Sequence, residues 1–101
     1  MARKIDISDK LNFEENPVIV VDGVEIEVNS DAETMLRVMG AFDGESETKA
    51  ISKAIGLMFS EADREKLYAI RRDGRKLSLR DLGTIVSSAV DEVMGDGGEK
   101  G

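Results

Sequence analysis

The residue types that could do chemistry are carboxylates and cations, because the 101-residue chain contains no histidine and no cysteine. That excludes disulfides, thiol nucleophiles, Ser-His triads and zinc sites of the usual kinds. Carboxylates remain, as in Glu14–Glu15 and Asp91–Glu92, but a catalytic carboxylate needs burial or a charged partner, and these pairs lie in polar stretches typical of a solvated surface. The sequence therefore predicts no catalytic residue and no cofactor, and it argues against an enzyme.

The alternating acids Asp43, Glu45 and Glu47 suggest a calcium loop, but the spacing does not fit one. An EF-hand counted from Asp43 needs glycine sixth and glutamate twelfth, whereas Gly44 is second and Ala54 is twelfth. No metal site is predicted.

The cation cluster Arg71, Arg72, Arg75 and Lys76 is the second candidate site. It lies between two predicted helices, which raises a helix-turn-helix reading for nucleic acid. The exposed face of the following helix carries Asp91 and Glu92 and no cation, and the net charge of −7 opposes phosphate binding. The alternatives are an exposed loop between helices, or a binding site for an acidic protein segment such as the acidic N-terminal half of another copy.

Charge is divided along the chain in a way that favours such pairing. Residues 1–48 carry 12 acidic and 4 basic side chains, whereas residues 49–80 carry 4 acidic and 9 basic ones. We expect a protein partner or a homo-oligomer. No apolar stretch of signal-peptide length follows the N-terminus, and the chain is too interrupted by polar residues for a membrane protein, so we expect it in the cytoplasm.

A β-hairpin is the clearest local prediction. The β-branched run 18–21 is followed by Asp22–Gly23 and by an alternating run whose core-facing residues are Val24, Ile26 and Val28. Residues 3–16 alternate weakly through Ile5, Ile7, Leu11 and Phe13, which raises a third strand as an alternative.

Four short helices follow. The first helix begins with a Ser30–Glu33 capping box, has an apolar stripe and ends at Asp43–Gly44, and the second helix spans about 46–59. The third helix is capped by Ser60 with Asp63 and closes with Arg71 and Arg72 before Asp73–Gly74. The fourth helix runs from Ser78, which forms a capping box with Asp81, to Gly95. The first stripe comprises Ala32, Met35, Leu36, Met39 and Phe42. Gly56, inside the second helix, costs about 1 kcal/mol relative to alanine, a cost that a close neighbouring backbone would explain.

The predicted fold is therefore α+β: an N-terminal hairpin, of two or three strands, packed on a bundle of about four short α-helices. We expect residues 1–95 to form one domain and residues 96–101 a flexible glycine-rich tail.

Residues 57–95, LMFSEADREKLYAIRRDGRKLSLRDLGTIVSSAVDEVMG, resemble the C-terminal part of tail assembly chaperones of long-tailed phages and prophages of Gram-positive bacteria. The shared elements are a capped FSEADREKL helix start, a basic link and an amphipathic last helix. The resemblance implies a non-enzymatic protein that keeps the helical tape-measure protein in solution and recruits tail-tube subunits. A small nucleic-acid-binding regulator and a structural virion subunit are the alternatives.

The family carries no active-site residues, so candidate partner contacts come from this chain. Methionine suits adaptable binding grooves as well as cores. We nominate Met35, Met39, Met58 and Phe59 on the helices, and the cations Arg71, Arg72, Arg75 and Lys76 in the link. Core packing is the alternative role for the methionines.

Overall fold

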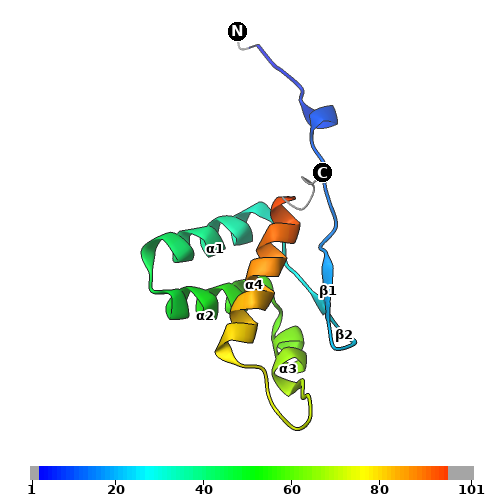
Figure 1. Ribbon diagram of the computed structural model, residues 1–101. Helices are drawn as coiled ribbons and strands as arrows, with labels where there is room; N and C mark the ends of the chain where they lie inside the picture. The colour runs from blue at the N-terminus through cyan, green and yellow to red at the C-terminus, as the bar shows by residue number, and fades with distance from the viewer. Residues whose placement is uncertain (1–2, 96–101) are drawn as a thin grey trace.

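The computed structural model describes residues 3–95 and has an α+β architecture, in which a two-stranded hairpin precedes four helices (Figure 1). The elements are η1 (Ser8–Lys10), β1 (Val18–Val21), β2 (Val24–Glu27), α1 (Ala32–Gly44), α2 (Glu47–Met58), α3 (Glu61–Ala69) and α4 (Leu79–Met94). The expected hairpin and four-helix order are confirmed. The predicted flexible tail, 96–101, lies outside the described residues.

The hairpin forms as the Asp22–Gly23 signal predicts. Both turn residues have positive φ, 49° and 82°, and β1 pairs antiparallel with β2 in the register Val21↔Val24 and Ile19↔Ile26. Ile26 is fully buried, as is Val28 just beyond the strand.

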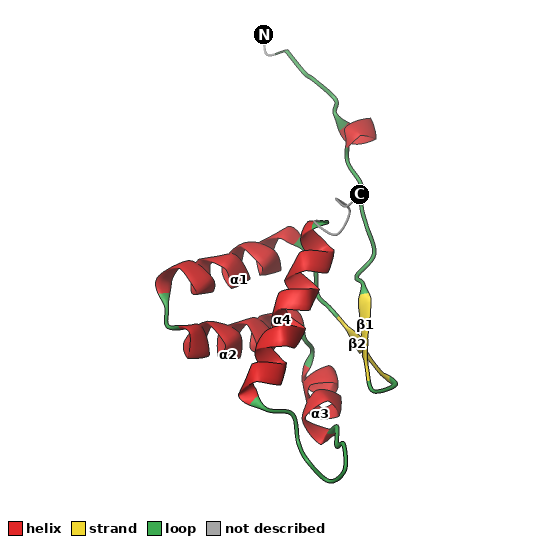
Figure 2. Cartoon of the chain, in the orientation of Figure 1, coloured by secondary structure: helices red, strands yellow, loops and turns green. Residues whose placement is uncertain are grey.

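The third strand, raised as an alternative for residues 3–16, does not form. Within the described chain the sheet has two strands, and residues 3–16 hold only the short η1 (Figure 2). This arm leads away from the helices and contributes to a longest dimension of 66 Å against 30 Å in the other two. Its apolar residues find no strand to pair with, and Phe13 is 89% exposed.

The helix caps follow the sequence except at α1. Ser46, Ser60 and Ser78 each accept a hydrogen bond from the main chain three residues on, and Ser78 with Asp81 forms a complete capping box. At α1 the cap is Asp31, whose carboxylate accepts from the Thr34 amide. The predicted Ser30 box is wrong because the Ser30 amide and hydroxyl both donate to Asn16 Oδ1.

The apolar stripe of α1 is also rotated from the predicted one. Leu36 is 70% exposed, whereas Val38 and Ala41 are buried beside Met35. Residues 35, 38 and 41 lie on one side of a helix, and packing against α2 selects that side. The prediction placed Leu36 in the stripe because periodicity alone does not fix which of two overlapping faces is covered.

The third helix is shorter than predicted. It ends at Ala69, so Arg71 and Arg72 follow the helix rather than close it. Asp73–Gly74 forms a second tight turn, with φ of 54° and 79° and a bridge between Arg72 and Arg75 closed by hydrogen bonds of 2.9 and 3.0 Å. The basic link is therefore a miniature hairpin.

One apolar cluster joins β2 to all four helices. Its largest fully buried members are Phe59, Ile26, Met58, Leu67, Val28, Val38 and Val86. No close backbone explains Gly56, since a Cβ there would meet nothing within 4 Å among residues 3–95.

Candidate functional site

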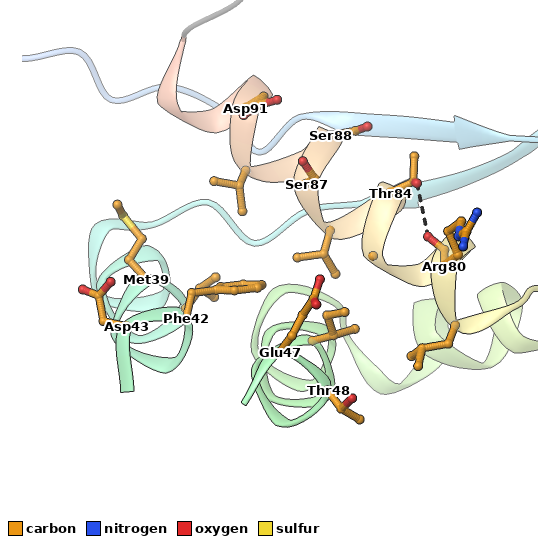
Figure 3. A pocket seen from close by; sticks show the side chains of 16 residues that line it. Met39, Phe42, Asp43, Glu47, Thr48, Arg80, Thr84, Ser87, Ser88 and Asp91 are labelled. Carbon is orange, nitrogen blue, oxygen red and sulfur yellow. Dashed lines mark hydrogen bonds between the residues drawn. The ribbon is translucent and has the colours of Figure 1, made fainter. Parts of the chain in front are cut away.

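An open groove lies between α1 and α4, above α2, on which both helices pack (Figure 3). It has a volume of about 990 Å³. Its floor is apolar and comes from the buried residues Val38, Ile51 and Val86. Large apolar side chains at its margin remain partly exposed: Met39 41%, Phe42 42% and Leu79 55%. The groove thus offers an apolar surface that the described chain leaves partly uncovered.

The sequence of α4 explains why the groove is open on one side. Gly83 faces α2, where an added Cβ would lie 3.5 Å from the Ile51 side chain, an ordinary packing contact. Thr84, Ser87 and Ser88 are exposed on the groove side and are too short to reach across to α1. In Figure 3, Phe42 projects from α1 into the space between the helices. Small polar groups therefore face a large apolar one across the groove.

The groove margin is acidic. Asp43 on α1, Glu47 on α2 and Asp91 on α4 line it, together with Arg80, the one cation among the described residues that line the groove. These charges are exposed and would interact with a ligand mainly through rim contacts, which affect encounter rate and partner choice more than affinity. An apolar surface bordered by carboxylates suits an amphipathic segment with cations beside its apolar stripe.

Of the nominated helix residues, only Met39 lies at this surface. Met35 is 5% exposed, Met58 is fully buried and Phe59 is 1% exposed. These three belong to the core, the alternative role that the sequence left open for the methionines. Phe42 was placed on the apolar stripe but not nominated as a contact, and Leu79 was missed because it follows the Ser78 cap outside the α4 stripe.

Two of the four residues of the basic cluster, Arg71 and Arg72, are engaged with their own chain. Arg72 donates to both carboxylate oxygens of Asp22 at 3.1 and 2.5 Å, and these hydrogen bonds lower the pKa of Asp22. Arg71 donates to the main-chain oxygens of Tyr68 and Ile70. The cluster thereby ties the miniature hairpin to the β1–β2 turn.

Arg75 and Lys76 are the cluster members whose side chains make neither an ion pair nor a hydrogen bond among residues 3–95, whereas Arg71 and Arg72 each make hydrogen bonds. They border a second hollow of about 450 Å³, whose apolar lining includes Val21, Leu77 and Ile85. The lining also holds Asp22, Asp73 and Asp81 beside Arg72, so Arg75 and Lys76 are the cations at this hollow that remain open to an acidic partner.

The carboxylates show no arrangement for acid–base chemistry in the described part of the chain. There, no charged or polar side chain is buried, and no three acidic side chains gather where they could hold a metal ion. The carboxyl pKa values that are clearly shifted, such as those of Asp31 and Asp81, are lowered by hydrogen bonds from Thr34 and Ser78. A catalytic acid needs the opposite shift.

Comparison with family models, with curated proteins and with solved structures finds no match to this chain. Across residues 3–95, none of the helices has the length and apolar character needed to cross a membrane.

Proposed function

We propose that this protein is a non-enzymatic assembly chaperone that covers an apolar helical stripe of its partner in the α1/α4 groove. Met39, Phe42 and Leu79, exposed around an apolar floor, carry the proposal. Because residues 57–95 resemble tail assembly chaperones, we propose that its particular role is to assist tail assembly in a long-tailed phage or prophage. Its partners are then the tape-measure protein and tail-tube subunits, met in the bacterial cytoplasm.

The dimensions of the groove support a helix as the occupant. Helices of 13 and 16 residues, the lengths of α1 and α4, extend about 20 and 24 Å, so their sides can contact roughly four turns of a bound helix. A helix in a groove presents apolar residues at spacings of three and four. A long helical partner with an apolar stripe provides such segments repeatedly.

The acidic margin supports a partner with basic residues beside its stripe. Asp43, Glu47 and Asp91 outnumber Arg80 at the groove, so a helix carrying lysine or arginine on its flanks meets complementary charge. Binding by apolar burial with charged flanks is reversible, which lets the chaperone leave when the tail tube takes its place.

The test is co-purification of the full chain with the tape-measure product encoded beside it. We expect a complex with the wild type and with Leu36→Asp, and loss of the complex with Phe42→Asp. Leu36 is the matched control, because it is an exposed apolar residue of α1 that does not line the groove. No complex with the wild type, or equal binding by Phe42→Asp, contradicts the proposal.

Purified particles separate the chaperone from a structural subunit. A chaperone leaves before maturation, so we expect none of this chain in particles analysed by mass spectrometry. Stoichiometric recovery in the particle would instead make it a virion component and overturn the chaperone role.

A further inference from the structure

The two edges of the β-hairpin differ in how their outward main-chain groups are used. In an antiparallel hairpin, hydrogen-bonded residue pairs alternate with pairs that are not hydrogen-bonded. The two-residue turn makes Val21 and Val24 a hydrogen-bonded pair, and the Val28 amide donates to the Pro17 oxygen at 2.9 Å, four residues further along each strand. The main-chain groups of Glu25 and Glu27 therefore point away from β1. By the same alternation, those of Val18 and Val20 point away from β2.

Side chains of α3 close the β2 edge. The Glu27 amide donates to Asp63 Oδ2 at 3.0 Å, and Lys66 Nζ donates to the Glu25 oxygen at 2.9 Å. Asp63 and Lys66 also form an ion pair of 3.3 Å. This pair occupies the outward donor and acceptor where a further strand would have to bind.

The β1 edge has no such cover within residues 3–95. No loop, cap or side chain there hydrogen-bonds to the outward groups of Val18 and Val20, whose side chains are 53% and 63% exposed. The run Val18–Val21 also lacks the charge or proline that commonly protects an edge strand. It is therefore a template for strand addition.

We infer that two copies of this chain pair through antiparallel β1 edges about a two-fold axis at Ile19, with residues 13–15 of each copy lying against the basic miniature hairpin of the other. In this register, Val18 of one copy lies opposite Val20 of the second, and their outward amides and oxygens exchange hydrogen bonds. The surface is self-complementary, as an isologous dimer requires. The product is a four-stranded sheet closed at both ends by α3.

The N-terminal arm extends the contact. Continuing the register places Asn16 opposite Asp22 of the second copy and Glu15 opposite Gly23. Glu14 and Glu15 then lie beside the turn that Arg72 binds, close to Arg75 and Lys76. The arm thereby brings two carboxylates to Arg75 and Lys76, whose side chains have no ion pair and no hydrogen bond among the described residues.

Phe13 supplies the apolar part of the same contact. It is 89% exposed on its own chain, and the second hollow has an apolar lining that includes Val21, Leu77 and Ile85. Two four-residue strands alone bury less than the roughly 1,200–2,000 Å² of a stable interface, so the reciprocal arms are needed to complete it. The segment Phe13–Glu14–Glu15 brings a ring to the apolar part of this lining and two carboxylates to Arg75 and Lys76, while Asp22 of the same lining is already bound by Arg72.

The inference goes beyond the proposed function and uses no residue of the α1/α4 groove. The test is sedimentation equilibrium of the full chain, with Val20→Pro and Val20→Thr as a matched pair. Proline removes the outward amide that a second copy needs and leaves the β1–β2 hydrogen bonds in place, whereas threonine keeps the amide. We expect dimers of the wild type and of Val20→Thr, and a monomer of Val20→Pro with an unchanged circular dichroism spectrum.

A charge exchange tests the arm without touching the strand. Glu14→Lys with Glu15→Lys should weaken the dimer about tenfold, and adding Arg75→Glu with Lys76→Glu should restore it. A monomeric wild type, or a dimer of folded Val20→Pro as tight as the wild type, overturns the β1 pairing. Dimer affinity unmoved by the charge reversal overturns the docking of the arm.

Discussion

One phenylalanine belongs to the core and another to the proposed binding surface, so truncating each to alanine should change the unfolding free energy by very different amounts. Phe59, just after α2, is 1% exposed, whereas Phe42 on α1 is 42% exposed at the groove margin. The same atoms are removed in both variants, so the difference in unfolding free energy reports the surroundings of each ring.

For Phe59→Ala we expect a loss of about 3–5 kcal/mol, because a buried ring leaves a cavity that the neighbouring Met58 and Leu67 cannot fill. For Phe42→Ala the buried part of the ring amounts to slightly more than half. Its transfer free energy is about 1–1.5 kcal/mol, and the better helix propensity of alanine offsets about 0.5 kcal/mol of that. The net loss should be about 0.5–1 kcal/mol, since the site opens to solvent and no cavity forms.

Urea unfolding followed by far-ultraviolet circular dichroism measures both losses. A domain of this size has a total stability of about 5–15 kcal/mol, so Phe59→Ala should unfold at markedly lower urea, while Phe42→Ala stays close to the wild type. A loss of about 3 kcal/mol or more for Phe42→Ala would mean that its ring is core rather than binding surface. A loss below about 1 kcal/mol for Phe59→Ala would refute the core assignment.

Three further predictions test the local structure. Gly56→Ala should raise the unfolding free energy by about 0.5–1 kcal/mol, because a Cβ there meets no neighbour and alanine favours the helix; a loss in urea unfolding would contradict this. Ser78→Ala should lower the unfolding free energy by about 1 kcal/mol because α4 loses its cap, and Ser30→Ala should lower it less because Ser30 caps no helix. Equal losses in thermal unfolding would mean that Ser30 does cap α1. Acid should weaken the tie between Asp22 and Arg72: the pKa of Asp22 is lowered, so its contribution is full above the ordinary value of 3.8 and lost as the pH falls through the folded-state value. Melting temperatures measured from about pH 5 to 2.5 should fall for the wild type and fall less for Asp22→Asn.

The local elements of this fold are readable from the sequence because short-range chemistry specifies them. Asp22–Gly23 supplies the positive φ values of a tight turn, and Ser46, Ser60 and Ser78 supply helix caps. The same Asp-Gly signal recurs at Asp73–Gly74, where it forms a second tight turn that the sequence interpretation treated only as a helix end.

Features decided by distant contacts were not readable. Ser30 and Asp31 are adjacent candidates for one cap, and Asn16, far back in the chain, engages Ser30 and leaves the cap to Asp31. The buried side of α1 is chosen by α2, which exposes Leu36.

The groove depends on tertiary structure in the same way. Its walls, α1 and α4, are separated in the sequence by two other helices, so no local pattern could place Phe42 opposite Ser87. The edge difference of the hairpin likewise depends on Asp63 and Lys66, which follow β2 by more than thirty residues.

Amide chemical-shift mapping shows whether the α1/α4 groove binds an apolar helix, as we propose. The isotope-labelled full chain is titrated with a peptide of about 20 residues, taken from the tape-measure segment that co-purifies with it. Such a peptide is about 30 Å long as a helix. We expect saturable shifts centred on the amides of Met39, Phe42, Gly83 and Ser87. These shifts should be absent with Phe42→Asp and retained with Leu36→Asp. Shifts confined to residues 71–76 or to β1, with the groove amides unmoved, would contradict the proposal.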